Sequence, residues 1–381
     1  MFPELYQKHL TTQLNKASYL ILSILVQLLQ SYRWVGLEEL TNKFPQPILF
    51  ESRRKKLQRF LDLPSLTIET IWLPIFKDWL NKRFAKEEVL CIAIDRTRWG
   101  LINLLMVSLI INHRAIPIYF ELLDHVGNSD LETQTAILGR VLPVLKGYTK
   151  VILGDREFCS VDLAKWLQQQ EKTYFCLRLK RNCYLEVEQE VWMQLQAVGL
   201  KPGLSLYFQG VKVTKTKGFA GANVVCKWKR KYRGWTADEA WFILTNLDSL
   251  DEALIAYQKR FGIEEMFRDF KTGGYNLEGT KVEEKRLMTL ILVITLAYSQ
   301  ATLCGEIIKN KGVAKYVGRV TEKGRNYPRH SNFYLGLHAI AWVESIQFFA
   351  VEIRELMKLS PQNCANYQRG LRAATLIGST L

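Results

Sequence analysis

Residues 88–124, EVLCIAIDRTRWGLINLLMVSLIINHRAIPIYFELLD, indicate the fold of the chain. A first apolar run ends at Asp95, and a second apolar run follows after a tight turn. A break at Asn112 to Arg114 separates the second run from a third. Short runs rich in β-branched and aromatic residues, bounded by turn residues, are typical of strands. The stretch therefore predicts three successive strands, the last two of them joined as a hairpin.

Downstream of this stretch, helical and strand patterns alternate. Residues 131–145 and 160–170 have the composition of helices, and Ser160 is placed to cap the second one. Residues 150–158 and 173–182 are short apolar strands. The order β-β-β-α-β-α-β is that of a ribonuclease-H-like sheet. We therefore expect an α/β fold with a ribonuclease-H-like core.

The rest of the chain divides around this core. Alternating residues and glycine turns over about 183–240 predict a β-rich insertion, followed by a strand at 240–247. A helix is expected from about Leu250, and residues 284–305 predict a strongly apolar helix. The predicted divisions are an α-helical N-terminal domain (1–85), the core with its insertion (88–305), and a basic and helical C-terminal region (306–381).

The N-terminal segment contains a helix, a break at two prolines, and a second helix at about 50–64. The second helix contains, in its first half, four consecutive basic residues, Arg53, Arg54, Lys55 and Lys56. A basic helix after a break is compatible with a small DNA-reading module. The alternative is that these four side chains form a solvated helix face.

The amino-acid composition indicates which class of molecule the protein binds. The chain has 52 Lys and Arg against 37 Asp and Glu, a formal net charge of +15 in 381 residues. That surplus suggests a polyanion, nucleic acid before a membrane surface. The apolar segments 20–29 and 287–298 are shorter than the roughly 18 residues of a membrane span, so we expect buried helices and no membrane partner. Seven scattered cysteines without metal-binding spacing indicate a reducing cytoplasm.

Two carboxylates follow predicted strands. Asp95 and Asp155 each stand at the C-terminal end of an apolar run, where ligands collect in α/β sheets. A single such Asp is most often a turn or cap residue. Two on adjacent strands would project from one edge and repel each other unless a cation lay between them. Mg²⁺ and Mn²⁺ prefer oxygen ligands, and a third carboxylate would complete a two-metal site.

The stretch YQKRFGIEEMFRDFKTGG, residues 257–274, offers that third carboxylate on a predicted amphipathic helix. At about 100° per residue, Tyr257, Arg260, Glu264 and Lys271 share one stripe beside the apolar face. The same geometry turns Glu265 and Asp269 away from that face. Without other information, Arg260 and Glu264 would be an ordinary i,i+4 ion pair on a helix surface.

The spacing of these four residues resembles a known signature. Tyr257, Arg260, Glu264 and Lys271 match the Y-(2)-R-(3)-E-(6)-K pattern of bacterial insertion-sequence DDE transposases of the insertion-sequence-4 family. The resemblance covers roughly residues 88–300. It assigns the catalytic triad of the family to Asp95 in AIDRTRW, Asp155 in LGDREF, and Glu264.

The resemblance implies an activity, cofactors and partners. The triad would hold two Mg²⁺ or Mn²⁺ ions for cut-and-paste DNA transposition, with a hairpin at the element's end before strand transfer. A homodimer would act on double-stranded DNA, at terminal inverted repeats and at the target, in the nucleoid region of a bacterial cytoplasm. Tyr257, Arg260 and Lys271 would contact phosphates near the cut.

Further DNA contacts are expected beside the triad. Trp241 matches the base-stacking tryptophan of the family by its place before the signature helix, and its alternative is a core tryptophan. Trp228 and Trp235 are rivals for that role on a basic segment, and Arg178 would meet DNA from the strand after Asp155. Two other functions stay open, a ribonuclease-H-like nuclease that cuts without joining and a catalytically silent DNA-binding repressor derived from a transposase.

Overall fold

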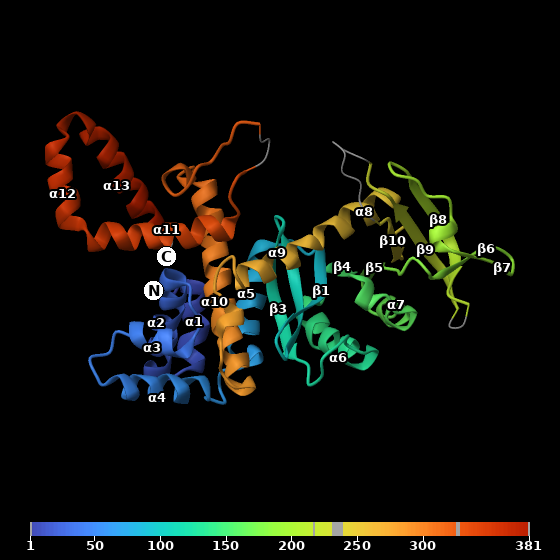
Figure 1. The fold of residues 1–381 in the computed structure, drawn as a ribbon, viewed down its shortest axis with the longest axis horizontal. Helices are drawn as coiled ribbons and strands as arrows, with labels where there is room; N and C mark the ends of the chain where they lie inside the picture. Colours follow the sequence, from blue (N-terminus) through green and yellow to red (C-terminus); the bar gives the residue numbers. More distant parts are fainter. Residues whose placement is uncertain (1, 216–217, 231–238, 325–327, 380–381) are drawn as a thin grey trace. The chain divides into compact units, whose positions relative to one another are not determined.

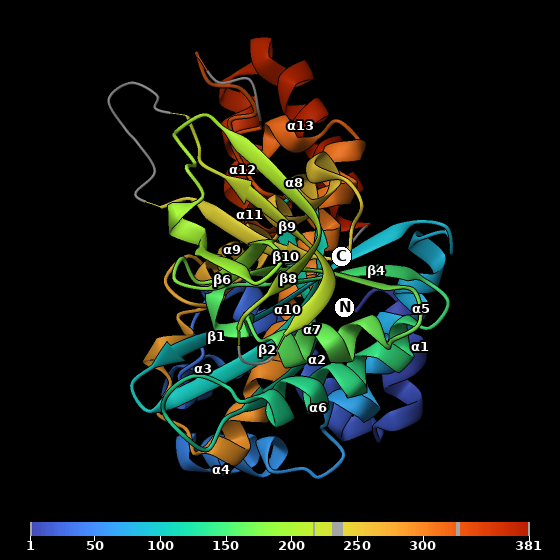
Figure 2. The same cartoon turned by 90° about the vertical axis from the view of Figure 1, so that its right-hand side faces the viewer.

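The computed structural model describes residues 2–215, 218–230, 239–324 and 328–379, and Figures 1 and 2 show the chain from two sides. The chain folds into two compact units. One unit comprises Leu80–Phe267, and the other comprises Met1–Trp79 together with Arg268–Leu381. The unit Leu80–Phe267 contains the sheet and both predicted aspartates.

The sheet has ten strands among the described residues, in the order β3-β2-β1-β4-β5-β10-β9-β8-β6-β7. β1, β4 and β5 pair in parallel, whereas β2, β3 and β10 pair antiparallel to their neighbours. The strands are β1 (Val89–Trp99), β2 (Ile102–Ile111), β3 (Arg114–Leu122), β4 (Thr149–Gly154), β5 (Thr173–Arg178), β6 (Tyr184–Glu188), β7 (Val191–Gln194), β8 (Ser205–Val213), β9 (Phe219–Lys227) and β10 (Trp241–Thr245).

The three strands predicted from residues 88–124 are confirmed as β1, β2 and β3. β2 is buried along almost its whole length, which explains its continuous apolar run. Asn112 and His113 form the turn before β3, with φ of 47° and 64°. Two consecutive positive φ values give the turn that matches the twist of a hairpin, and Asn and His tolerate this conformation better than most residues.

Helices cover both sides of this sheet. α6 (Leu131–Val141) packs on β2 and β3, and α7 (Val161–Gln168) packs on β5. α8 (Leu250–Lys259) packs on β4, β5 and β9, and Figure 1 shows it on the side opposite to α6 and α7. In Figure 2, β8 and β9 run at a steep angle to β1 and β2, as the regular twist of neighbouring strands requires. The strands predicted for about residues 183–240 are present as β6 to β9, which extend the sheet, and their role as an insertion stays a prediction.

Gly154 ends β4 at a point where no side chain fits. A Cβ at this position would lie 2.7 Å from Cβ of Phe158 and 3.0 Å from Cδ2 of Leu177. Phe158 is fully buried and comes from the short turn Arg156–Phe158 that follows Asp155. The absence of a side chain at Gly154 therefore lets the chain fold back over the strand end directly after Asp155.

The predicted single helix through residues 257–271 is wrong, because the chain forms two helices, α8 and α9 (Phe261–Phe270), with a break at Arg260. The N–H groups of Arg260 and Ile263 donate to the carbonyls of Tyr257 and Arg260, a tighter turn than an α-helix. Gly262 lies at the same point against the backbone of Arg114, where a Cβ would be 3.2 Å from its carbonyl carbon. Contact with the β2–β3 turn therefore fixes where α9 begins.

The break also corrects the predicted orientation of two acidic residues. Glu265 does not point into solvent but forms an ion pair with Arg114, Oε2 to Nη1, at 2.9 Å. Asp269, predicted to face away from the apolar side, is buried. An angular projection assumes one unbroken helix, so it fails for residues that follow the tight turn at Arg260.

The other unit is helical in its described residues. Its N-terminal part contains α1 (Glu4–Gln13), α2 (Lys16–Tyr32), α3 (Leu37–Lys43) and α4 (Phe50–Leu61), and α5 (Leu73–Arg83) crosses its boundary. Its C-terminal part contains α10 (Glu284–Asn310), α11 (Asn332–Phe348), α12 (Ala350–Leu359) and α13 (Cys364–Gly378). Gly305 and Gly336 let α10 and α11 touch, since a Cβ at either would lie 1.8 Å from the facing backbone oxygen.

The compact units cut across the predicted three-part division. α10, predicted within the core 88–305, belongs to the same unit as α1 to α4 and residues 306–381. The division into a helical DNA-binding domain, a core and a C-terminal region stays a prediction about function. The helical character predicted for residues 1–85 is confirmed.

α10 also corrects the prediction about membrane spans. Within the described residues it is the one single helix that length and composition would allow to cross a membrane, and two bent helix pairs, α2 with α3 and α11 with α12, would also qualify as joined spans. The predicted segment 287–298 is therefore part of a longer helix than expected. The apolar window of α10 is 89% buried within the folded chain, which confirms it as a buried helix.

Gly154→Ala is expected to destabilise the protein by about 1–3 kcal/mol, because Phe158 or Leu177 must move to accept the new methyl group. The measurement is the free energy of unfolding from urea titrations of both proteins.

Gly139→Ala is the matched control. Gly139 lies in α6 with nothing within 4 Å of its would-be Cβ, so the same change should stabilise by about 0.5–1 kcal/mol. Equal effects at both positions would contradict the steric role of Gly154.

Candidate active site

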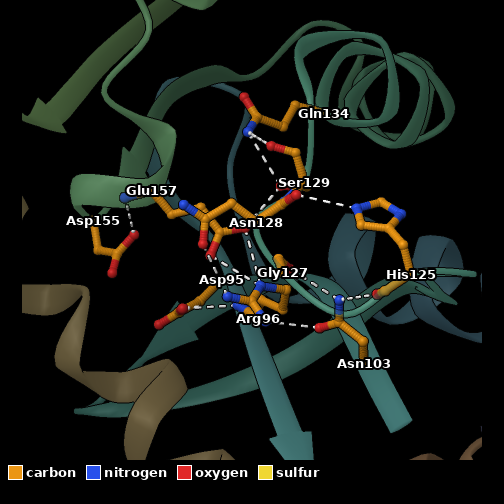
Figure 3. A network of polar contacts seen from close by, with 10 residues as sticks. All are labelled: Asp95, Arg96, Asn103, His125, Gly127, Asn128, Ser129, Gln134, Asp155 and Glu157. Atoms are coloured by element: carbon orange, nitrogen blue, oxygen red, sulfur yellow. Dashed lines mark hydrogen bonds and ion pairs between the residues drawn. The ribbon is translucent and has the colours of Figure 1, made fainter. Parts of the chain in front are cut away.

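Asp95 and Asp155 lie side by side at the ends of two paired parallel strands. The last register pair of β1 and β4 is Ile94 with Gly154, so the next residue on each strand is an aspartate. Oδ1 of Asp95 accepts from the N–H of Arg96 at 2.7 Å, and Oδ1 of Asp155 accepts from the N–H of Glu157 at 2.8 Å. Figure 3 shows both carboxylates in this arrangement. The predicted adjacency of the two aspartates is thus present in the structure.

Arg260 lies between Asp95 and the third predicted carboxylate. Its Nη1 donates to Oδ2 of Asp95 at 3.1 Å, and its Nη2 donates to Oε1 of Glu264. The Arg260 side chain is only 6% exposed, whereas that of Glu264 is 48% exposed. The guanidinium therefore occupies a buried position and joins two carboxylates that would otherwise repel each other.

Burial dominates the acidity of Asp95. Its pKa is raised from 3.8 to about 7, chiefly by removal from water, and the negative charges of Asp155 and Glu264 act in the same direction. Arg260 and the N–H of Arg96 oppose this shift but do not cancel it. A carboxyl group that keeps its proton near neutral pH has too little positive charge in its surroundings to stabilise the ionised form. A bound divalent cation would supply that charge.

The fit to a metal ion is good for two of the three predicted ligands. Asp95 and Asp155 are hard oxygen donors on adjacent strand ends, as Mg²⁺ or Mn²⁺ requires. Across the part of the chain that the structure describes, no group of three His, Cys, Asp or Glu side chains is close enough to hold an ion. Glu264 would become a ligand only after its ion pair with Arg260 opens.

The aromatic residues predicted to meet DNA are buried in this unit. Tyr257 is fully buried, and its ring meets Trp241 edge to face at 5.2 Å between centroids. Trp241 is also buried, with Nζ of Lys229 4.9 Å from the centre of its ring. This arrangement matches the alternative of a core tryptophan. Trp228 is half-buried, and Trp235 lies outside the described residues.

Arg178 shares an acidic partner with a second arginine. Its Nη2 is 3.3 Å from Oε2 of Glu239, and Nη1 of Arg156 is 2.7 Å from the same oxygen. These three side chains, with Arg181 and Trp228, line a hollow of about 130 Å³. Arg178 therefore lies where the prediction put it, on the strand after Asp155, but its charge is partly offset.

The remaining predicted DNA-binding residues belong to the other compact unit. Lys271 forms an ion pair with Glu278 at 2.7 Å. Within the basic run on α4, Arg54 pairs with Glu38, Lys56 donates to Gln46, and Arg53 lies 6.0 Å from the ring of Phe50. Lys55 is exposed. Part of this run is therefore engaged within its own unit, and a role in DNA binding stays a prediction.

Two residues beside the aspartates were not predicted. Arg96 and Glu157, one and two positions after the two aspartates, form an ion pair with 16% and 10% side-chain exposure. A charged residue one or two positions after a strand-end aspartate, Arg96 in IDRTRW and Glu157 in GDREF, is the local signal that points to them.

Comparisons with known proteins identify the domain. A family model described as a transposase DDE domain matches residues 93–299, more than half of the chain. No curated protein matches the chain. A solved structure, the cryo-EM structure of the piggyBac transposase synaptic complex with hairpin DNA, is similar at 12% identity and a TM-score of 0.46, over 91% of this chain and 77% of that one.

The contribution of Asp95 to the free energy of unfolding is expected to fall as the pH rises. Its pKa is about 7 in the folded protein and near 3.8 in the unfolded chain. Between these values only the folded state holds the proton, so the free energy of unfolding should fall as the pH rises from about 4 to about 7. Urea titrations across this range, with a chelator present, measure the effect.

Asp95→Asn is the reference for this measurement, since an amide does not ionise. The stability of the wild-type protein relative to this variant should decline with pH. Parallel pH profiles for the two proteins would show that Asp95 titrates normally.

Proposed function

Because the chain belongs to the family defined by the transposase DDE domain, we propose that it carries out cut-and-paste transposition of an insertion sequence. The reaction is metal-dependent phosphoryl transfer, with strand cleavage at terminal inverted repeats and strand transfer into target DNA. The observation that carries the proposal is the adjacency of Asp95 and Asp155, with Glu264 joined to Asp95 through Arg260.

The sheet supports the ribonuclease-H-like assignment of the core. Strands β3-β2-β1-β4-β5 follow one another, with β1, β4 and β5 parallel and β2 antiparallel to β1. The two aspartates stand at the carboxyl ends of β1 and β4, the edge where α/β sheets collect ligands. The spacing of Tyr257, Arg260, Glu264 and Lys271 supports the insertion-sequence-4 family.

Asp95, Asp155 and Glu264 would hold two Mg²⁺ or Mn²⁺ ions. Bound divalent ions supply charge stabilisation at the reacting phosphate and acidify an attacking water or hydroxyl. Asp95 would give up its proton to act as a ligand. Its raised pKa therefore links ligand formation to pH near neutrality.

Arg260 has two roles in this proposal. Without metal or DNA, its guanidinium neutralises Asp95 and Glu264. With DNA present, its fork of N–H donors suits a phosphate oxygen pair as well as it suits carboxylates. Exchange of Glu264 for phosphate would free this glutamate for the metal while keeping Arg260 paired.

The DNA contacts and assembly complete the proposal. Arg178, Lys271 and the run Arg53 to Lys56 would contact phosphates, and Trp241 or Trp228 would stack on an extruded base in a hairpin intermediate. For Trp241, stacking would require the ring to leave Tyr257. A homodimer would pair the two ends of the element in the bacterial cytoplasm, at the nucleoid.

A joining assay separates this function from its rivals. DNA carrying the element's terminal inverted repeats is incubated with Mg²⁺ and a target plasmid. The proposal expects cleavage at the repeats and joined products. Cleavage without joining or repeat dependence would indicate a nuclease, and binding without cleavage would indicate a silent repressor.

Glu264→Gln is expected to reduce Mg²⁺-dependent cleavage by about 10³-fold or more, since loss of a metal ligand removes several kcal/mol of transition-state stabilisation. Binding of the repeat DNA should change little, because it depends on phosphate contacts elsewhere. Single-turnover cleavage and a gel-shift titration measure the two effects.

Glu265→Gln is the control for this variant, as the neighbouring residue of the same type. Glu265 pairs with Arg114 and is not among the proposed ligands, so its cleavage rate should stay within a few-fold of wild type. If Glu264→Gln cleaved as fast as this control, Glu264 would not be a ligand.

DNA binding is expected to be strongly dependent on salt. Contacts to about 6–10 phosphates would weaken affinity by about 10³–10⁵-fold between about 50 and about 200 mM salt. Lys55→Gln, on the exposed side of α4, should lower the slope of log affinity against log salt by about one.

Lys358→Gln provides the comparison, since Lys358 is exposed but paired with Glu355 on α12. Its slope should equal that of the wild-type protein. A salt-independent affinity, or equal slopes for the two variants, would contradict the predicted role of the α4 run.

A further inference from the structure

The two residues that hold the aspartates also hold each other. The N–H of Arg96 donates to Asp95, and the N–H of Glu157 donates to Asp155. The side chains of Arg96 and Glu157 then meet, with Nε of Arg96 at 3.0 and 2.9 Å from the two Glu157 oxygens. Main-chain and side-chain contacts of the same two residues thus connect one carboxylate to the other.

A third segment, between β3 and α6, closes around this ion pair. The backbone N–H and the hydroxyl of Ser129 both donate to Oε1 of Glu157 at 2.9 Å. Nη2 of Arg96 donates to Asn128 at 3.2 Å, and its Nη1 donates to Asn103 at 2.8 Å. Figure 3 shows these contacts around the two aspartates.

Asn103 and Gln134 fix the segment in turn. Nδ2 of Asn103, a fully buried residue at the start of β2, donates to the carbonyls of His125 and Gly127 at 2.7 and 3.0 Å. Nε2 of Gln134 donates to the carbonyl and hydroxyl of Ser129 at 3.0 and 3.1 Å. The ion pair therefore has partners on every side, as a buried polar network must have to be rigid.

The contacts of Glu157 distinguish it from a metal ligand. Its Oε1 accepts three hydrogen bonds and its Oε2 accepts from Nε of Arg96, so both oxygens already face donors. An ion pair that is largely removed from water contributes little net stability compared with apolar packing, so stability alone does not account for one at this place. Its location, one position after Asp95 and two positions after Asp155, accounts for it as a pair that positions the aspartates.

We propose that Arg96 and Glu157 are positioning residues, which set the separation and orientation of Asp95 and Asp155 for divalent cations. The proposal rests on the proposed function of the site. Residues behind the ligands of a metal site usually contribute about 10–100-fold to metal affinity or activity. Loss of either member should therefore weaken metal binding without removing a ligand.

The direction in which two substitutions change the affinity for a divalent cation distinguishes a positioning role from a purely electrostatic one. If only charge mattered, Arg96→Gln would remove a positive charge and tighten cation binding, whereas Glu157→Gln would weaken it. If geometry matters, both variants weaken cation binding. The double variant should then bind about as weakly as the worse single variant, because both changes break the same contact.

The test measures binding of Mn²⁺ to the full chain by electron paramagnetic resonance, alongside single-turnover cleavage with Mg²⁺. We expect Arg96→Gln and Glu157→Gln each to weaken Mn²⁺ binding by about 10–100-fold, with unchanged binding of the repeat DNA. Thermal unfolding confirms that each sample is folded. If either variant does not fold, Ser129→Ala, which removes one hydrogen bond to Glu157, should weaken Mn²⁺ binding in the same direction.

Glu186→Gln is the matched control. Glu186 forms an ion pair with Lys212 on β8 and has 11% side-chain exposure, close to that of Glu157, but lies on β6 near the far edge of the sheet. It should bind Mn²⁺ as the wild-type protein does. Variants of Arg96 and Glu157 that match this control, or that shift binding in opposite directions, overturn the proposal.

Asp95→Asn separates a failure of this inference from a failure of the proposed function. If the wild-type chain and Asp95→Asn bind Mn²⁺ equally, no metal site exists at the aspartates and both proposals fail. If Asp95→Asn loses Mn²⁺ while Arg96→Gln and Glu157→Gln keep it, only the positioning role fails.

Discussion

Repulsion between two neighbouring carboxylates shapes the whole of this site. Parallel pairing of β1 with β4 places Asp95 and Asp155 side by side, directly after Ile94 and Gly154. Burial raises the pKa of Asp95 to about 7, so the ionised form is unfavourable without positive charge nearby. The two carboxylates therefore need stabilising partners at fixed positions. The backbone donors, the Arg260 guanidinium and the Arg96–Glu157 ion pair are these partners.

The cation that offsets this repulsion differs between states in our account. Arg260 serves when no metal is bound, because its two terminal nitrogens contact Asp95 and Glu264. Divalent ions would take over in the active complex, and a DNA phosphate would take over Arg260. Replacement of Arg260 by divalent ions requires that one carboxylate can move while the other two stay fixed. Glu264 is the exposed member of the set, whereas the aspartates are fixed by backbone N–H groups.

The strands and the two aspartates could be predicted because their signals are local. Apolar runs that end at Asp95 and Asp155 need only their neighbours in sequence to be recognised. The break at Arg260 could not be predicted in this way, because it depends on contact between Gly262 and Arg114 on a distant hairpin. The same contact brings Glu265 to Arg114, which lies 151 residues away in the chain. An angular projection of the helix alone does not include Arg114, so it places Glu265 in solvent.

The basic surplus of the chain was equally hard to assign from sequence. Charge counts suggest nucleic acid, but they do not tell which cations already have acidic partners. Arg54 with Glu38, Lys271 with Glu278 and Arg178 with Glu239 are pairs between residues too far apart in sequence for spacing to show them. Trp241 has the same difficulty, since its burial against Tyr257 depends on how α8 packs on the sheet.

Anomalous diffraction from crystals of the chain with Mn²⁺ and a short DNA duplex would show whether Asp95 and Asp155 hold a divalent ion. We expect a manganese peak in contact with both Asp95 and Asp155, with Glu264 turned toward it and released from Arg260. A structure with Arg260 still bridging Asp95 and Glu264, and with no manganese between the aspartates, would contradict it.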